Sequence, residues 1–275
     1  MVDENAAGVR SVQLAIDILE AIAFSGEGLG VTQIADRLHV TKGSVHRHLL
    51  TFVERGYLLQ DTSTARYSIG PKGRLLARFS PDVDLLHLAD GPMLVLREAL
   101  GHTVVLSAMT PRGALVLSTR SSNSTIEIGV RPGSELPFHA SAQGKVLLAY
   151  APGPFQNRIL ARTLEQLTPK TITEPDRLEA ELTQIFKEGF STAPEQTMLG
   201  INALAAPLFD ERDACVGALA IVGSIQFLPE HAKAEEVAHL KATSEQISRK
   251  LGYGGHQGRE ETERPRGRSI KRAGA

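Results

Sequence analysis

The chain has 275 residues, of which 42% are apolar and 22% are charged; this composition is typical of a folded protein and excludes one that is disordered throughout. At roughly 100 to 200 residues per domain, the length predicts two domains. Thirty basic and 31 acidic residues give a net charge of -1, which excludes a protein that holds nucleic acid by bulk charge alone.

The charge is unevenly distributed along the chain. Residues 1–80 carry a net charge of +1, residues 81–258 carry -5, and residues 259–275 carry +3. Within the first part, residues 37–78 hold eight basic side chains against two acidic ones, a local charge of +6. The sequence therefore predicts a basic island in an otherwise slightly acidic protein.

The features that mark other compartments do not occur in the sequence. The first residues lack the basic and apolar regions of a secretory signal. No apolar run approaches the roughly 18 to 20 residues that span a bilayer. Cys215 is the single cysteine, so neither an internal disulfide nor a cysteine metal site is expected. A cytoplasmic protein is predicted.

The N-terminal part is expected to begin with three helices. Apolar residues recur at helical spacing over residues 11–24, and a glycine-rich loop follows. Thr32 is placed to cap a short helix through about residue 38, and Thr41 is placed to cap a third helix over residues 42–55.

Gly56 suits the left-handed position that ends the third helix. Residues 57–60 and 66–69 then predict two short strands around a polar turn at residues 61–65. Three helices followed by a β-hairpin describe a winged helix-turn-helix.

The third helix has the properties of a DNA-reading helix. Its apolar stripe leaves a cationic face that includes Arg47 and Arg55. The major groove of B-DNA admits one such helix, and Arg47 is the best candidate for a bidentate contact to guanine. For any single charged residue, the alternative to a DNA contact is that the side chain only faces water on the outer side of the helix. The predicted DNA contacts are Thr41, Lys42, Ser44, His46, Arg47, His48 and Thr51 on the helix, and Ser63, Thr64 and Arg66 in the hairpin.

The remainder of the chain predicts a connector and an α+β domain. The connector is helical over residues 71–79 and 82–100, with an interruption around Gly91 and Pro92, and it is apolar enough to pack against a neighbour. Strands are expected at residues 102–109, 115–119, 126–130, 201–208 and 214–222, and helices at residues 142–150, 155–164, 177–188 and 230–251, the first of these capped by Ser141.

Two blocks of sequence resemble one known family. The segment VTQIADRLHVTKGSVHRHLLTFVERGY (residues 31–57), with RYSIG (residues 66–70), resembles the DNA-binding domain of the IclR family of bacterial transcriptional regulators. The segment GVRPGSELPFHASAQGKVLLA (residues 129–149) resembles that family's effector domain, and residues 189–223 continue the match. The resemblance covers about residues 10–251.

The resemblance implies a domain organisation. It places a winged helix-turn-helix domain at residues 10–70, a linker helix and dimerisation region at 71–100, and a GAF-like α/β effector-binding domain at 101–251. We expect residues 1–9 and the basic tail at 252–275 to be disordered. The family implies dimers, often paired as tetramers, that bind palindromic double-stranded DNA and a small molecule, often a metabolic organic acid or an aromatic compound. No cofactor is expected. Repression is its commoner mode.

The resemblance also implies the residues of an effector pocket. Ser141, Ala142, Gln143 and Gly144 match the segment that meets the ligand's acidic end, and Thr125, Ile128 and Ile201 match positions around the cavity. Four positions that are polar or reactive in relatives binding small polar acids are Ala193, Ala203, Ala220 and Val222 here. We therefore expect a more apolar and larger effector, such as an aromatic carboxylate, the alternative being that the last three are ordinary strand core.

Other candidate residues predict structural roles. His139 has no nucleophile paired with it by any known motif, Lys145 is expected to face solvent or an ion pair, and Cys215 is expected to pack in a strand. No catalytic or metal-binding residue is assigned. Two alternative functions remain: an enzyme acting on a small organic acid with an accessory DNA-binding domain, and a protein-interaction module with a degenerate winged helix.

Overall fold

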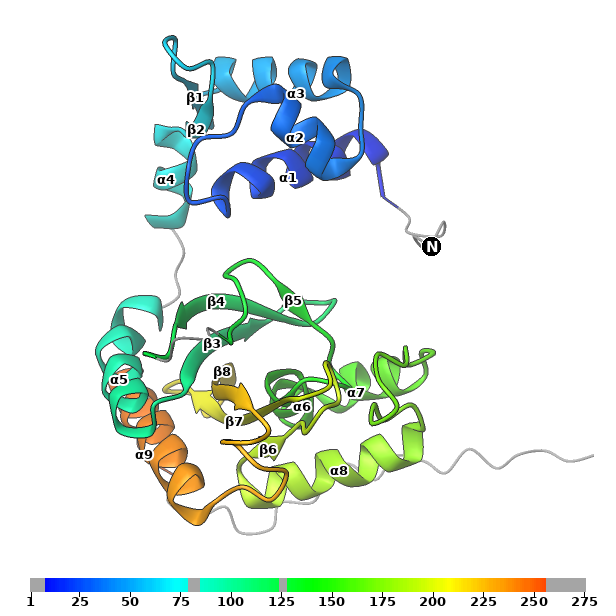
Figure 1. Cartoon of the computed structure of the whole chain (residues 1–275), viewed down its shortest axis with the longest axis vertical. Helices are drawn as coiled ribbons and strands as arrows, with labels where there is room; N and C mark the ends of the chain where they lie inside the picture. Colours follow the sequence, from blue (N-terminus) through cyan, green and yellow to red (C-terminus); the bar gives the residue numbers. More distant parts are fainter. Residues whose placement is uncertain (1–7, 79–84, 124–127, 256–275) are drawn as a thin grey trace, which may run out of the picture.

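The computed structural model describes residues 8–78, 85–123 and 128–255. The proposed tail beyond residue 255 and most of the proposed N-terminal segment lie outside this range. The N-terminal part comprises α1 (Arg10–Ala23), α2 (Val31–Leu38), α3 (Lys42–Glu54), β1 (Leu58–Gln60), β2 (Tyr67–Ile69) and α4 (Pro71–Arg78). Strands β1 and β2 form an antiparallel hairpin beside the helices (Figure 1). The predicted winged helix-turn-helix is therefore confirmed.

Local hydrogen bonds set the helix ends in this part. Thr41 Oγ1 accepts a hydrogen bond from the N–H of Ser44 at 3.3 Å and caps α3 as predicted. The cap of α2 is Gly30 rather than Thr32, because the Gln33 side chain reaches back to accept from the N–H of Gly30 at 3.0 Å. Gly56 adopts a φ of 77° just after α3, the left-handed conformation that a glycine adopts at little cost.

One apolar core holds the N-terminal part together. Ile18 from α1, Ile34 from α2 and Leu49 from α3 are all fully buried, and the hairpin adds Leu58 and Tyr67. At about 1.5 to 3 kcal/mol for each large apolar side chain removed from water, this cluster supplies the main favourable term for a small domain. The packing leaves the opposite face of α3 free.

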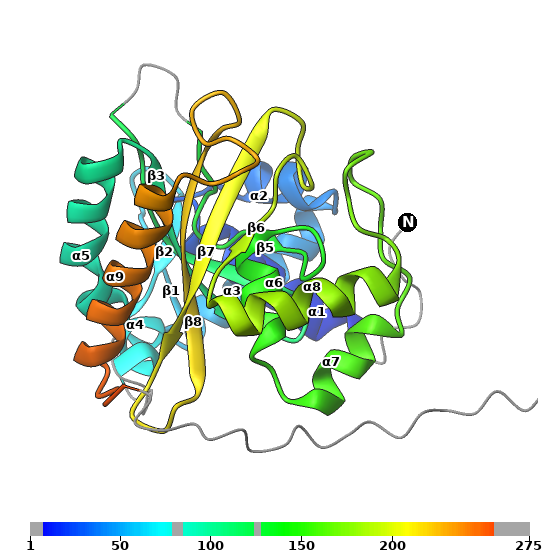
Figure 2. The ribbon, with the colours of Figure 1, turned by 90° about the horizontal axis from the view of Figure 1, so that it is seen from below.

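The C-terminal part is a three-layer α/β structure. A six-stranded antiparallel sheet has the order β5-β4-β3-β8-β7-β6. Helices α5 and α9 cover one face and α6 packs on the other, where α7 and α8 flank it (Figure 2). The strands are β3 (Thr103–Met109), β4 (Ala114–Arg120), β5 (Glu135–Leu136), β6 (Ser191–Thr192), β7 (Ile201–Phe209) and β8 (Cys215–Ser224), and the helices are α5 (Leu85–Leu100), α6 (Ala142–Ala149), α7 (Gly153–Leu160), α8 (Pro175–Glu188) and α9 (Ala234–Lys250).

Three sequence-based expectations about this part are wrong. Helix α5 continues through Pro92 without the predicted interruption, because the ring of Pro92 and the side chain of Met93 are buried and tertiary packing offsets the missing hydrogen bond. Residues 128–130 are not a strand; β5 takes the place beside β4 instead. The last helix begins four residues later than predicted, at Ala234.

The bounds of the remaining helices differ by a few residues. Helix α7 ends at Leu160, and the predicted extension to residue 164 is an irregular turn. Helix α8 begins at Pro175, a residue whose fixed φ and missing N–H suit the first turn. Among the residues described, every helix is too short or too polar to cross a lipid bilayer.

Candidate functional site

The exposed face of α3 is the first candidate site. Lys42, His46, Arg47 and Thr51 are exposed on it, whereas Ser44 and His48 are half-buried. The hydroxyl of Thr51 donates to the Arg47 carbonyl at 3.2 Å, one turn back along the helix. Val45 and Leu49 are fully buried on the other side, so packing fixes the orientation in which α3 presents its basic face.

The hairpin presents a turn held together by Asp61. Its Oδ1 accepts from the N–H of Ser63 at 2.8 Å and from the hydroxyl of Ser63 at 2.6 Å, with a longer contact to the N–H of Thr64. These hydrogen bonds lower the pKa of the exposed Asp61 carboxyl to about 2. The Asp61 carboxylate is therefore engaged within the hairpin, where it holds the turn together.

Arg66 is oriented differently from the other candidate DNA contacts. Its Nη1 donates to the Gly28 carbonyl at 2.9 Å and lies 3.8 Å from a carboxylate oxygen of Glu27. The guanidinium therefore ties β2 to the loop before α2. Ser63 and Thr64 remain at the exposed tip of the wing.

The second candidate site is a cavity of about 310 Å³ in the C-terminal part. This volume lies at the lower end of the range for small-molecule sites. Its lining is mostly apolar, and none of the lining residues that the structure describes carries a formal charge. The lining residues are Ile128, Gly129, Val130, Leu136, Ser141, Ala142, Gln143, Ala193, Thr197, Met198, Ile201, Asn202, Ala203 and Val222.

The N-terminus of α6 supplies the cavity's polar end. Ser141 Oγ caps the helix by accepting from the N–H of Gly144 at 3.0 Å, as predicted. The N–H groups of Ala142 and Gln143 precede the first intrahelical bond, so the helix itself provides them with no acceptor. Backbone donors at a helix N-terminus favour an anionic group.

Most predicted pocket residues lie together. Ile128, Ser141, Ala142, Gln143, Ala193, Ile201, Ala203 and Val222 line the cavity. Thr125 lies outside the described residues. Gly144 and Ala220 do not line the cavity: Gly144 packs so tightly that an added Cβ would lie 2.4 Å from the Pro137 carbonyl oxygen, and Ala220 is fully buried under α6.

Six residues that line the cavity were not predicted from the sequence: Gly129, Val130, Leu136, Thr197, Met198 and Asn202. Thr197 and Met198 belong to the loop between β6 and β7, which has no periodic pattern that would place them. Asn202 could have been identified from the sequence, because a polar side chain in an otherwise apolar strand needs hydrogen-bond partners. Its side-chain amide donates to the carbonyls of Leu228 and Pro229 at 3.2 and 2.9 Å.

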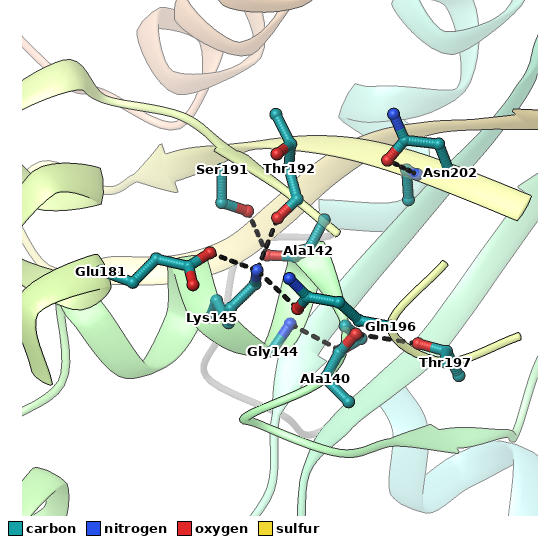
Figure 3. Close-up of polar contacts among 12 residues, drawn as sticks. Ala140, Ala142, Gly144, Lys145, Glu181, Ser191, Thr192, Gln196, Thr197 and Asn202 are labelled. Carbon is teal, nitrogen blue, oxygen red and sulfur yellow. Dashed lines mark hydrogen bonds and ion pairs between the residues drawn. The ribbon is translucent and has the colours of Figure 1, made fainter. Parts of the chain in front are cut away.

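Lys145 lies behind the cavity, in the first half of α6. Its side chain is fully buried, and its ammonium forms an ion pair with Glu181 of α8 (Figure 3). The ammonium also donates to the Thr192 carbonyl at 2.5 Å and to Gln196 Oε1 at 2.9 Å. Of the two predicted alternatives, the ion pair is present and the solvent-exposed position is not, because α8 and the β6–β7 loop close over the side chain.

Two further residues have the structural roles predicted for them. His139 is buried, and its Nε2 lies 2.8 Å from the Glu165 carbonyl oxygen, so the ring holds a loop. Burial raises the pKa of the Cys215 thiol to about 12, which leaves it an unreactive thiol in β8. Within the described ranges, no three His, Cys, Asp or Glu side chains gather closely enough to hold a metal ion.

Comparison with known proteins gives a consistent assignment. Residues 11–62 match the IclR helix-turn-helix domain, and residues 79–249 match the C-terminal domain of the bacterial transcriptional regulator IclR. The chain is 31% identical to the HTH-type transcriptional regulator BhcR of Paracoccus denitrificans, over 91% of this chain and 89% of that protein. It is 27% identical to the transcriptional repressor IclR of Escherichia coli, over 90% of this chain and 91% of that protein.

A solved structure shows the same arrangement of elements. The crystal structure of the Thermotoga maritima IclR superposes with a TM-score of 0.66 at 26% identity, covering 89% of this chain and 99% of that one. The two matched domains lie in the order that the fold requires, with the helix-turn-helix first. The chain therefore belongs to the IclR family of transcriptional regulators, with a DNA-binding helix-turn-helix domain and an effector domain.

Proposed function

We propose that this regulator represses a catabolic operon and releases its operator when an apolar or aromatic carboxylate occupies the cavity between α6 and the sheet. The observation that carries the proposal is a largely apolar cavity with one polar end, at the N-terminus of α6. Repression agrees with the name of the similar Escherichia coli repressor. A protein that binds a bacterial operator acts in the cytoplasm.

The chemistry of the lining favours an apolar ligand body. Ala193, Ala203 and Val222 offer no hydrogen-bonding side chain, and Ile128 and Met198 add apolar surface. A small, strongly polar acid would leave its own polar groups unpaired in such a cavity, which costs about 1 to 3 kcal/mol for each group. An aromatic carboxylate instead places its ring against the apolar wall and its carboxylate at the N–H groups of Ala142 and Gln143.

Isothermal titration calorimetry distinguishes the two ligand classes. Benzoate, 4-hydroxybenzoate and phenylacetate represent the aromatic carboxylates, and glyoxylate and pyruvate represent the small polar acids. We expect binding of at least one member of the first group with a negative heat-capacity change, the signature of apolar burial. Tight binding of glyoxylate or pyruvate, with no binding of the aromatic acids, would contradict the proposed effector.

DNA recognition is assigned to the exposed face of α3 and the tip of the wing. A homodimer, or a dimer of dimers, would present paired α3 helices to the two half-sites of a palindromic operator. An effector shifts the equilibrium between operator-competent and incompetent arrangements only if it binds one of them more tightly. The connecting helices α4 and α5 are the segment through which the two domains would be coupled.

Arg47→Ala tests the DNA-reading assignment. The substitution should cost about 1 to 3 kcal/mol of operator binding if Arg47 contacts a guanine, and it should leave the fold and the effector domain intact. Arg162→Ala removes the same charge from an exposed position after α7 and serves as the matched control. Unchanged protection of the operator by the Arg47 variant in a footprinting assay would refute the assignment.

A further inference from the structure

Among the residues that the structure describes, Lys145 is the most deeply buried charge that the function proposed above does not use. Its side chain has no exposed area, yet its ammonium meets three acceptors: a carboxylate oxygen of Glu181, the Thr192 carbonyl and Gln196 Oε1 (Figure 3). An ammonium has three N–H donors and a neutral amine has two. The contact set therefore matches the charged form of the side chain.

The electrostatic surroundings of Lys145 are asymmetric. Burial lowers its pKa, and the ion pair with Glu181 opposes that effect. The Glu181 side chain is 27% exposed whereas Lys145 is fully buried, so water screens the carboxylate more than the ammonium. The interior next to Lys145 is left with an incompletely balanced positive charge.

The partners of Lys145 belong to one wall of the cavity. Thr192 precedes the lining residue Ala193, and Gln196 precedes the lining residues Thr197 and Met198. The same wall is tied to the start of α6 by Thr197, whose hydroxyl donates to the Ala140 carbonyl at 2.9 Å. Lys145 thus joins α6, which supplies the polar end of the cavity, to residues 192–198, which close it.

We propose that Lys145 is a positioning residue of the effector pocket: it holds residues 192–198 against α6 and supplies, from behind this wall, the positive charge that the uncharged lining lacks. A charge in the weakly polarisable interior acts over a longer distance than one in water. Lys145 would therefore favour an anionic effector over a neutral ligand of the same shape. The second part of this inference rests on the carboxylate effector proposed above; the first part does not.

Hydrogen–deuterium exchange tests the positioning role without a ligand. In Lys145→Met the wall loses two hydrogen bonds, so peptides covering residues 192–198 should exchange about tenfold faster than in the native protein. Lys187→Met removes the same charge from the exposed face of α8 and should leave that exchange unchanged. Equal exchange in the native protein and a folded Lys145→Met variant would overturn the positioning role.

A double variant keeps this experiment decisive if the single variant fails to fold. Lys145→Met with Glu181→Met removes both members of the ion pair and leaves neither charge unpaired. The hydrogen bonds to Thr192 and Gln196 are still lost, so the same rise in exchange is expected at residues 192–198. Native-like exchange in the folded double variant would equally overturn the positioning role.

Substitutions of the two members of the ion pair test the electrostatic role. Lys145→Met should weaken the binding of benzoate about tenfold more than the binding of benzamide, its neutral isostere, because loosening of residues 192–198 affects both ligands and loss of the charge affects benzoate alone. Glu181→Gln keeps an acceptor for the Lys145 side chain but removes the ion pair that opposes the effect of burial on its pKa, so the ammonium loses stabilisation and benzoate binding should weaken a few-fold more than benzamide binding. A purely structural role would weaken both ligands equally in both variants, and that result would overturn the electrostatic part.

The results of these experiments distinguish a failure of the role proposed for Lys145 from a failure of the proposed effector class. If the native protein binds no aromatic carboxylate, the proposed effector class fails, and the exchange experiment still decides whether Lys145 positions the wall. If benzoate binds but Lys145→Met and Glu181→Gln weaken benzoate and benzamide equally, the effector class stands and the charge role of Lys145 fails.

Discussion

Hydrogen bonding lowers the pKa of the Asp61 carboxyl, whereas burial raises the pKa of the Cys215 thiol. Asp61 is fully exposed, yet accepting hydrogen bonds from Ser63 and Thr64 stabilises its charged form. Cys215 has few such partners, and burial disfavours its charged form. A local hydrogen-bonded turn can be anticipated from the sequence, because Asp, Ser and Thr within four residues commonly form one, whereas burial depends on distant parts of the chain.

The Asp61 carboxyl should titrate well below an ordinary aspartate. Its pKa falls from 3.8 to about 2 on folding, so its contribution to the wing is fully present above pH 3.8 and is lost as the pH falls through about 2. The chemical shift of the Ser63 amide, followed by NMR from pH 5 downward, should report that midpoint. The transition should be absent in Asp61→Asn; a midpoint near pH 4 in the native protein would show that the turn is not formed.

Helix α6 shows how one short element combines capping, close packing and site geometry. Ser141 caps it, Lys145 ties it to α8 and the β6–β7 loop, and Val146 and Leu147 bury it on the sheet. Gly144 permits the close approach of this helix to the preceding turn, because an added Cβ would meet the Pro137 carbonyl oxygen and the Phe138 backbone at 2.4 and 2.7 Å. The position of the pocket's polar end depends on that approach.

Gly144→Ala should therefore destabilise the effector domain, although alanine is the better helix former. The clash is with backbone atoms that cannot rotate away, and overpacking of this kind typically costs about 1 to 3 kcal/mol. Gly153→Ala, at the start of α7, is the matched control, since nothing lies within 4 Å of its added Cβ. Urea unfolding of both variants checks the difference; equal midpoints would show that the turn before α6 relaxes freely.

The whole molecule is built on separate apolar cores. The cluster around Ile18, Ile34 and Leu49 contains only residues from α1 to β2 and the segments between them, whereas the clusters around Leu148 and Leu240 contain only residues beyond α4. Separate cores permit separate unfolding, because a cavity in one does not remove contacts from another. The proposed response to an effector requires this independence, because each domain would keep its shape while their relative arrangement changes.

Leu49→Ala should lower the stability of the N-terminal domain alone. The side chain is fully buried, and such truncations cost about 2 to 5 kcal/mol. Differential scanning calorimetry should show one transition moved to lower temperature and one unchanged, with operator binding lost at the temperature of the moved transition. Leu240→Ala, equally buried in the C-terminal part, should move the other transition. A single transition shifted by both variants would mean that the two domains unfold as one unit.

Features set within one turn of chain could be predicted from the sequence. The caps at Thr41 and Ser141, the end of α3 before Gly56 and the exposed basic face of α3 each depend on residues a few positions apart. The winged helix-turn-helix follows from these local features and the hairpin. The resemblance to the family then predicted most of the residues that line the cavity.

Only the tertiary structure decided the contacts between residues that lie far apart in the chain. Tertiary packing lets α5 continue through Pro92, places the Arg66 guanidinium against the Gly28 carbonyl, and brings Thr197 to the cavity lining. It also buries Lys145, a residue type that sequence places at the surface by default. The physical reason is that the position of a charged residue or a proline depends on all of its contacts, including those with distant parts of the chain. For Lys145 those partners lie 36 to 51 residues away, beyond the reach of any local pattern.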